Sequence, residues 1–108
     1  MTHPLNTLSA ALFAPLVGSA FALRGAEGTA LAVSLARCEE HPRATMPGGP
    51  RTAFSLELSC PAAGVPAFTG GTFLLWHETL GEIGPLYVER ILPTGYGPGL
   101  AVFQIIFT

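Results

Sequence analysis

Apolar and polar residues alternate along most of the chain, which is the pattern of β-strands rather than of helices. Residues 52–60 are the clearest case, because Phe54, Leu56 and Leu58 occupy alternate positions with Ser or Glu between them. Weaker or two-sided forms of the same alternation recur elsewhere. They predict further strands over residues 21–24, 29–38, 72–78, 82–91 and 100–108.

The strands at 72–78 and 82–91 form a predicted central hairpin that is apolar on both faces. A two-residue turn at 80–81 would pair Phe73 with Val88, although Leu is a poor turn residue and leaves a longer loop open. Two apolar faces each need a cover. The domain core can cover one face, and a second sheet, a helix or another protein chain must cover the other. The predicted inner face holds Phe73, Leu75, Leu86 and Val88, and the outer face holds Leu74, Trp76, Tyr87 and Ile91.

A short helix is expected before the first strand. Residues 8–18 predict one or two helical turns, with Thr7 or Ser9 at the start, Pro15 as an interruption and Gly18 at the end. No strand–helix–strand repeat follows, so the sheet should be largely antiparallel. The predicted fold is mainly β: a six-stranded antiparallel meander forming a small barrel or sandwich, with a short N-terminal helix. Residues 1–108 are expected to form a single domain.

Composition limits the possible functions. Hydrophobic residues make up 49% of the chain and charged residues only 11%, against about 25% in an average protein. So few surface charges favour assembly into something larger. The absence of Lys and Asp excludes a P-loop, a Ser-His-Asp triad and a Schiff-base lysine. A net charge of −2 without a basic stripe argues against nucleic-acid binding.

The cysteines and the N-terminal segment bear on the compartment. In the predicted strand pairing, Cys38 and Cys60 lie roughly 25 Å apart, so two free thiols and a reducing or indifferent compartment are expected. Residues 8–23 look like the apolar core of a secretory signal, but the first seven residues carry no Lys or Arg. Cytoplasmic synthesis without a cleaved signal peptide is therefore favoured. Pro and Gly interrupt the same run, so no membrane span is expected.

The potentially reactive groups form no convergent set in the sequence. His77 ends a strand and is expected to be half-buried and to form hydrogen bonds near the following turn. Cys38 and His41 have the spacing of half a zinc site, but no second pair of ligands accompanies them. The length of the proline-rich loop at 39–50 makes it a candidate functional loop or merely a mobile one. The sequence therefore predicts no catalytic residue, no metal and no cofactor.

Three stretches of the sequence have the character of a family pattern. They are Arg51-x-x-Phe54-Ser-Leu56, then Gly71-Thr-Phe-Leu-Leu-Trp-His77-x-x-Leu80-Gly81, then a Pro-x-Gly turn with a closing strand that ends at Phe107. Together they resemble an uncharacterised bacterial β-domain family, a domain of unknown function, from near Phe13 to the C-terminus. Trp76 and the 39–50 loop depart from that pattern. Members are often encoded near phage-tail-collar-type proteins, so the resemblance implies a tail-like or fibre-like particle and no catalytic residues.

From the two-sided strands, the low charge and the resemblance, we expect a non-enzymatic structural or adaptor protein that assembles with a protein partner or with itself. The predicted partner-binding residues are the outer face of the hairpin: Leu74, Trp76, Tyr87 and Ile91. The alternative function is a small β-barrel that binds an apolar ligand inside a ring of Phe54, Leu56, Phe73 and Leu75. An enzymatic function is a weaker hypothesis than either of these two, because the sequence shows no set of polar residues that would come together in one site.

Overall fold

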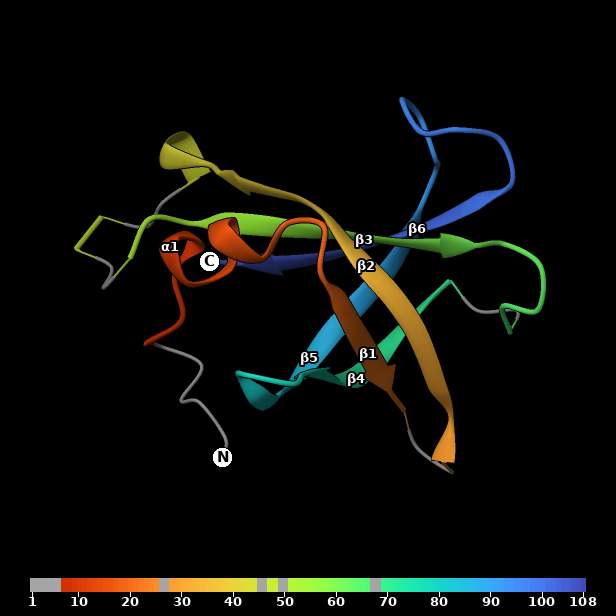
Figure 1. Cartoon of the computed structure of the whole chain (residues 1–108). Helices are drawn as coiled ribbons and strands as arrows, with labels where there is room; N and C mark the ends of the chain where they lie inside the picture. The colour runs from red at the N-terminus through yellow and green to blue at the C-terminus, as the bar shows by residue number, and fades with distance from the viewer. Residues whose placement is uncertain (1–6, 26–27, 45–46, 49–50, 67–68) are drawn as a thin grey trace.

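The computed structural model of the protein describes residues 7–25, 28–44, 47–48, 51–66 and 69–108. These residues form a closed barrel of six antiparallel strands, which confirms the predicted fold in its barrel form (Figure 1). The strands are β1 (Ala20–Arg24), β2 (Ala30–Glu40), β3 (Phe54–Pro61), β4 (Gly70–His77), β5 (Gly81–Ile91) and β6 (Leu100–Phe107).

The strands do not follow chain order around the barrel. The order is β1-β2-β3-β6-β5-β4, so the chain forms two three-stranded meanders, joined where β3 pairs with β6 and β1 pairs with β4. The expectation of one sequential meander is corrected in this respect. The reason lies in β3, which pairs with β6 in unbroken register from Phe54↔Phe107 to Pro61↔Leu100, while β2 pairs along its other edge. No edge of β3 is left for β4.

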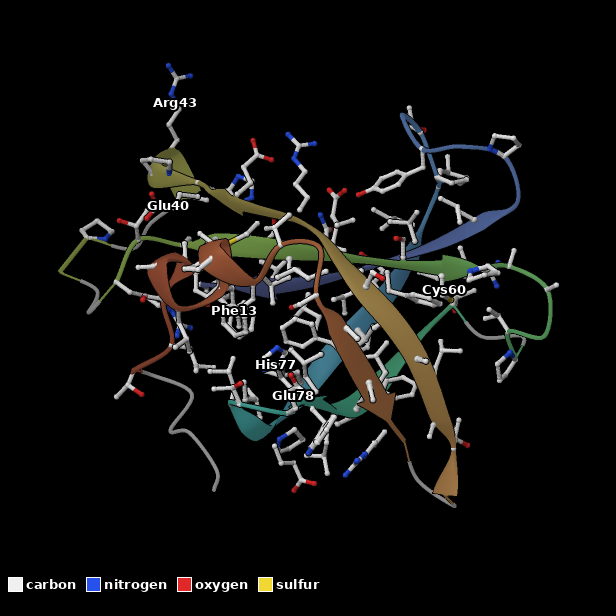
Figure 2. All side chains as sticks on the ribbon, in the orientation of Figure 1. Phe13, Glu40, Arg43, Cys60, His77 and Glu78 are labelled. Atoms are coloured by element: carbon white, nitrogen blue, oxygen red, sulfur yellow. The ribbon has the colours of Figure 1, made fainter. Side chains whose placement is uncertain are left out.

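The segment before β1 closes one end of the barrel. It contains the helix α1 (Ala10–Phe13) and the 3-10 helix η2 (Ala14–Leu16), which confirms the predicted short N-terminal helix. Phe13 is fully buried beneath α1 (Figure 2), and its ring centroid lies 5.9 Å from that of Phe54 and 6.0 Å from that of Phe107. Phe54 and Phe107 stack on each other with centroids 4.5 Å apart. These aromatic rings fill the barrel below the helix.

Arg51 ties two distant segments to the same aromatic rings. Its Nη1 donates a hydrogen bond to the main-chain oxygen of Leu8 (3.1 Å), and its Nε donates to that of Thr108 (3.2 Å). The guanidinium also lies over the rings of Phe54 and Phe107, at 5.7 and 5.5 Å from their centroids, which is cation–π range. The arginine of the family-like motif therefore has a structural role at the closed end of the barrel.

The central hairpin keeps its predicted faces but has another register. Phe73 pairs with Leu86 rather than Val88. The connecting loop has three residues, between His77 and its partner Gly81, rather than the predicted two. The longer of the two predicted loops is therefore the one that forms, and Gly81 at its end has a positive φ of 76°. A slip of two residues keeps Phe73 and its new partner on the inner face, whereas a slip of one would have exchanged the faces.

Two β-bulges interrupt the simple alternation. The register of β2 shifts between Leu35 and Arg37, and that of the central hairpin shifts between Phe73 and Leu75. In β2, both Leu35 and Cys38 consequently pack against the core, although they are three positions apart. In β5, Ile83 becomes fully buried, where unbroken alternation would have placed it on the outer face.

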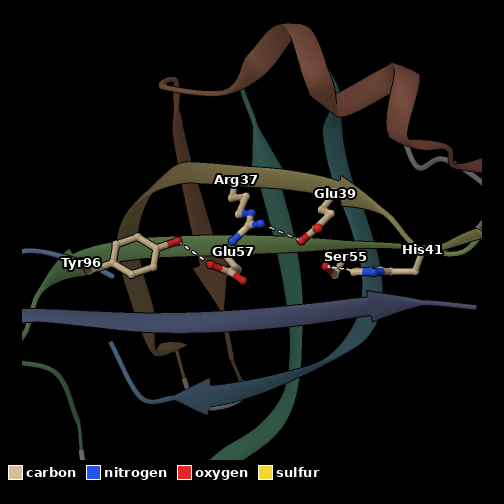
Figure 3. Close-up of polar contacts among 6 residues, drawn as sticks. All are labelled: Arg37, Glu39, His41, Ser55, Glu57 and Tyr96. Carbon is tan, nitrogen blue, oxygen red and sulfur yellow. Dashed lines mark hydrogen bonds and ion pairs between the residues drawn. The ribbon is translucent and has the colours of Figure 1, made fainter. Parts of the chain in front are cut away.

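The loop after β5 folds back over the outside of the barrel. The Tyr96 hydroxyl donates a hydrogen bond of 2.6 Å to Glu57 Oε1 on β3, and so reaches across β6 (Figure 3). Val102, an outward residue of β6, is completely buried. Burial of the phenol, together with the hydrogen bond to Glu57, raises the pKa of Tyr96 to about 12. The loop is thus tied to β3, and Val102 is buried at a position that the strand pattern alone would leave in water.

Candidate functional site

Three of the four predicted partner-binding residues lie together on the outer surface of β4 and β5. We name Leu74, Trp76 and Tyr87 the outer strip. Leu74 and Trp76 are partly exposed, and Tyr87 is 64% exposed. Tyr87 pairs with Thr72, four residues before Trp76, so the strip extends about 13 Å along β4. This is an apolar surface in contact with solvent.

The fourth residue, Ile91, points to the same side but lies outside the strip. It lies beyond the last β4–β5 pair, Gly70↔Glu89, and pairs with Val102 of β6 instead. Ile91 is partly buried. The sequence therefore placed all four side chains on the outer face, and three of them belong to the paired part of β4 and β5.

Neighbouring residues hold the two aromatic side chains of the strip. The guanidinium carbon of Arg24 lies 4.9 Å from the centroid of the Trp76 ring, a cation–π contact. Tyr87 extends over Gly70 on the adjacent strand, where an added Cβ would clash with the Tyr87 hydroxyl oxygen. Gly70 is therefore the residue that leaves room for the tyrosine to lie against the barrel wall.

The barrel carries a second outer feature, a groove of about 680 Å³. It lies between the end of β2, the 3-10 turn η4 (Pro42–Ala44) and the outward residues Ser55 of β3 and Ile106 of β6. Two other hollows lined by described residues measure about 220 Å³ each. Ile106 is 60% exposed. The groove is therefore mainly apolar and open to solvent.

A polar pair forms part of the groove wall. His41 Nε2 and Ser55 Oγ lie 2.8 Å apart, and Ser55 is only 4% exposed (Figure 3). The main-chain N–H of His41 donates to the carbonyl of Ala53 at 2.6 Å, which fixes the start of the turn. The Gln104 side chain lines the same groove. A mostly apolar hollow with a few hydrogen-bonding groups has the composition of a binding site.

The sequence predicted part of this region but not the groove. The 39–50 loop was expected to be a candidate functional loop or merely a mobile one. Its first two residues belong to β2, residues 42–44 form η4, and residues 45, 46, 49 and 50 lie outside the described part of the chain. The one visible signal was Ile106, an apolar residue at an outward position of the closing strand. The contact of His41 with Ser55 had no signal in the sequence.

His77 forms hydrogen bonds at the turn, as the sequence predicted, but its side chain is buried rather than half-buried. It is 4% exposed, and its Nδ1 accepts hydrogen bonds from the N–H groups of Thr79 (3.1 Å) and Leu80 (3.4 Å) in the turn. An accepting Nδ1 places the ring proton on Nε2, which faces Ser19 Oγ at 3.4 Å. Ser19 Oγ in turn donates to the carbonyl of Leu16 at 2.6 Å. The imidazole therefore caps the hairpin turn and links it to the N-terminal segment.

The cysteines are free, as predicted. Burial raises the pKa of the Cys38 thiol, and the nearby Glu40 carboxylate raises it further. Burial also raises the pKa of Cys60, with Arg90 acting in the opposite direction. Within the described residues, no group of three or more His, Cys or acidic side chains could hold a metal ion, and the Cys38–His41 half site has no complement there.

The sequence was compared with models of known protein families, and one of them matches. A family model described as a domain of unknown function, DUF6916, matches residues 8–107. The chain belongs to the DUF6916 family. Neither the curated proteins nor the solved structures gave a match.

The DUF6916 match agrees with the extent of the packed structure. It begins at Leu8, which is completely buried and is held by Arg51, and it ends at Phe107 in the aromatic cluster. The N-terminal segment is therefore part of the DUF6916 domain and not an appendage to the barrel. In the described residues of this DUF6916 chain, none of the helices has the length and apolar character to cross a membrane.

Proposed function

We propose that this protein is a non-enzymatic structural or adaptor subunit that binds another protein surface through the outer strip. The observation that carries the proposal is Tyr87, a large aromatic residue that is 64% exposed on a barrel wall. Exposed aromatic residues anchor protein interfaces, because they bury a large area and lose few rotamers on binding. Gly70 leaves the space in which Tyr87 lies, so the aromatic ring has a defined position before any partner arrives.

The packing inside the barrel supports assembly over the alternative of an internal apolar ligand. Of the four residues proposed to ring such a ligand, Phe54, Leu56 and Leu75 have no exposed surface and belong to one packed cluster. The stacked ring of Phe107 and the ring of Phe13 occupy the space beside Phe54. Displacing side chains of this size from a packed core costs about 2–5 kcal/mol each.

The setting that we propose is a phage-tail-like or fibre-like particle, in line with the family resemblance of the motifs. The charge content supports an assembled state, because the 108 residues include only 5 Arg or Lys and 7 Glu or Asp. A surface with so few charges opposes association weakly. The polar contacts in the described residues hold loops and turns in place, which is what a structural subunit requires.

A photo-cross-linker at the strip tests the proposal. A benzoylphenylalanine residue replaces Tyr87 in cells that make the protein, and the matched control carries it in place of Ala63, which is exposed in the connection between β3 and β4. We expect a protein adduct from position 87 on irradiation and none from position 63. A chain that stays uncross-linked at position 87, or that gives equal adducts from both positions, would overturn the proposed function.

A further inference from the structure

The outer strip and the groove are neighbours on the barrel surface. Tyr87 lies on β5, and Ile106, in the groove wall, lies on β6. These two strands are adjacent in the closed order and pair at Glu89↔Gln104. Tyr87 comes two residues before that pair and Ile106 two residues after it, so in antiparallel strands both lie on the same side of the pair, each about 7 Å along its own strand. Both side chains point outward and are at least 60% exposed.

A partner seated on Tyr87 has to extend beyond the outer strip. A protein interface of standard size involves about 20–30 residues on each side, far more than the three residues of the strip. On the β1 side of β4, the outward residues are Ala20, Ala22 and Arg24, which are small or charged. On the β6 side lie Ile106 and the mainly apolar groove. The apolar surface therefore continues from the strip towards the groove.

The lining of the groove suits an aromatic side chain that carries one polar atom. Its volume of about 680 Å³ lies in the range of about 300–1,000 Å³ that is usual for ligand pockets. Pro42, Ala44 and Ile106 supply apolar walls. A buried Tyr or Trp side chain needs a hydrogen-bond partner for its O–H or N–H, and the polar pair of His41 and Ser55 lies in the same groove (Figure 3). Tyr and Trp are also enriched among the residues that dominate binding energy.

The charges around the groove indicate what accompanies that side chain. Apart from His41, the groove wall contains one acid, Glu40, and one base, Arg43, so it favours neither an anion nor a cation. Glu89 is exposed beside the groove, where it pairs in the ladder with Gln104, and it has no ion-pair partner among the described residues. A basic residue of the partner next to the aromatic one would lie against this carboxylate. Charge pairs at the rim of an interface speed association and reject wrong partners.

We infer that the groove receives a tyrosine or tryptophan side chain of the protein that covers the outer strip, and that a Lys or Arg of that protein pairs with Glu89. The inference rests on the proposed function and adds to it the chemistry of the partner. The contact then spans β4, β5, β6 and the turn η4, with Tyr87 as an anchor on this chain and the groove as the pocket for an anchor on the other. Residues that dominate binding energy on one protein commonly pair with such residues on its partner.

A phenol tests the groove in purified protein. p-Cresol has the ring and hydroxyl of a tyrosine side chain, and toluene is the same molecule without the hydroxyl. Each is titrated into isotope-labelled protein, and the amide signals are followed by NMR. We expect saturable shifts at Ala44, Ser55 and Ile106, with a dissociation constant on the order of 1 mM for p-cresol and a value at least about 3-fold higher for toluene.

Two variants make the phenol test specific for the groove. Ile106→Lys should raise the p-cresol dissociation constant at least about 10-fold, and Leu92→Lys, at a position that is 81% exposed and outside both surfaces, should leave it unchanged. Both positions are at least 60% exposed, so each variant should fold, and its own amide spectrum verifies this. The inference is wrong if p-cresol shifts other residues instead, if it shows no saturation below about 10 mM, if toluene binds as tightly, or if Ile106→Lys has no effect.

Cross-linking in cells tests whether the partner of the strip enters the groove. Benzoylphenylalanine at position 87 is combined with Ile106→Lys or with Glu89→Gln. The matched controls combine it with Leu92→Lys or with Glu78→Gln, since Glu78 is an exposed acid in the loop between β4 and β5. The adduct from position 87 should fall at least about 10-fold with Ile106→Lys and about 3-fold with Glu89→Gln, and neither control should change it.

The two proposals fail in different ways in this experiment. An adduct that persists with Ile106→Lys, or that is insensitive to Glu89→Gln, overturns the inference and leaves the proposed function standing. If no adduct forms at position 87 in the otherwise unchanged chain, the proposed function fails, and the inference fails with it.

Discussion

Replacing His77 with Ala removes the group that holds the central hairpin turn. The imidazole is 4% exposed, and its Nδ1 is the acceptor for the N–H groups of Thr79 and Leu80. The contact of the Leu80 N–H with Nδ1, at 3.4 Å, is buried, and a buried donor left without an acceptor costs about 1–3 kcal/mol. Thr79 is exposed, so its N–H can bond to water after the substitution, and the two lost contacts together account for about 2 kcal/mol. The lost ring, whose centroid lies 4.6 Å from that of Phe21, adds about 1–2 kcal/mol for the cavity.

The expected total for His77→Ala is a loss of about 3–4 kcal/mol in the free energy of unfolding. Urea denaturation followed by circular dichroism measures it. With a urea dependence of about 1.5 kcal/mol per molar, the midpoint should fall by about 2 M. Trp76 fluorescence provides a second probe, because Trp76 is the one tryptophan in the chain. Coincidence of the two transitions confirms that the whole barrel unfolds together.

Two further variants separate the turn contact from the rest. In His77→Asn, the side-chain oxygen can take the place of Nδ1, so about 1–2 kcal/mol of the loss should return. Ser19→Ala removes the 3.4 Å contact to Nε2, and because that contact is long, it should cost less than about 1 kcal/mol. The reasoning is refuted if His77→Asn is no more stable than His77→Ala, or if His77→Ala loses less than about 1 kcal/mol.

Three other predictions concern the same barrel. Because the pKa of Tyr96 is raised from 10.0 to about 12, the stability that it contributes is fully present below pH 10 and is lost as the pH rises from 10 to 12. Urea midpoints of Tyr96→Phe should therefore fall less than those of the wild type across that window, and equal declines would contradict this. Arg51→Ala should lower the free energy of unfolding by about 1–3 kcal/mol, and Arg51→Lys should restore little, because an ammonium cannot form both hydrogen bonds while stacking on the rings. Phe13→Ala should cost about 3–5 kcal/mol in the same assay, and a loss below about 1 kcal/mol would mean that α1 is not part of the core.

Alternation predicted the strands well, and it failed at two points for a definable reason. A bulge adds one residue to one strand, and no single residue type in a sequence marks it. Unbroken alternation would place Cys38 and Ile83 on the outer faces, although both pack toward the core. The register predicted at Phe73 was wrong by two residues. An even error leaves each side chain on its predicted face of the sheet, so the assignment of faces was still correct there.

The order of the strands was less predictable than their positions. A sequence gives the length of the connection at residues 62–69, but not whether β3 has a free edge when β4 forms. In the structure, β6 pairs with the whole of β3 from Phe54 to Pro61. Pairing between strands far apart in the chain depends on which edges close first and fit best, and local patterns carry little of that information.

The two candidate surfaces differ in the same way in how far the sequence could predict them. The outer strip comes from one hairpin, so the alternation of Leu74, Trp76 and Tyr87 was sufficient to find it. The groove combines the turn after β2 with Ser55 of β3 and Ile106 of β6. Contacts between residues so distant in the chain are set by the closure of the barrel, so no local motif could have indicated the groove.

The assembly argument began from the excess of apolar residues on outward strand positions, and the structure reduces that excess. Val102 is completely buried, Ile91 beside it is partly buried, and the loop that carries Tyr96 bonds to Glu57 across the same strand β6. A single chain can therefore cover part of its own outer surface with a loop. What remains uncovered on the strands is more specific: Tyr87 on β5 and Ile106 on the neighbouring β6, both at least 60% exposed. Because Tyr87 is the most exposed residue of the outer strip, a change at that one position is sufficient to test the proposed assembly.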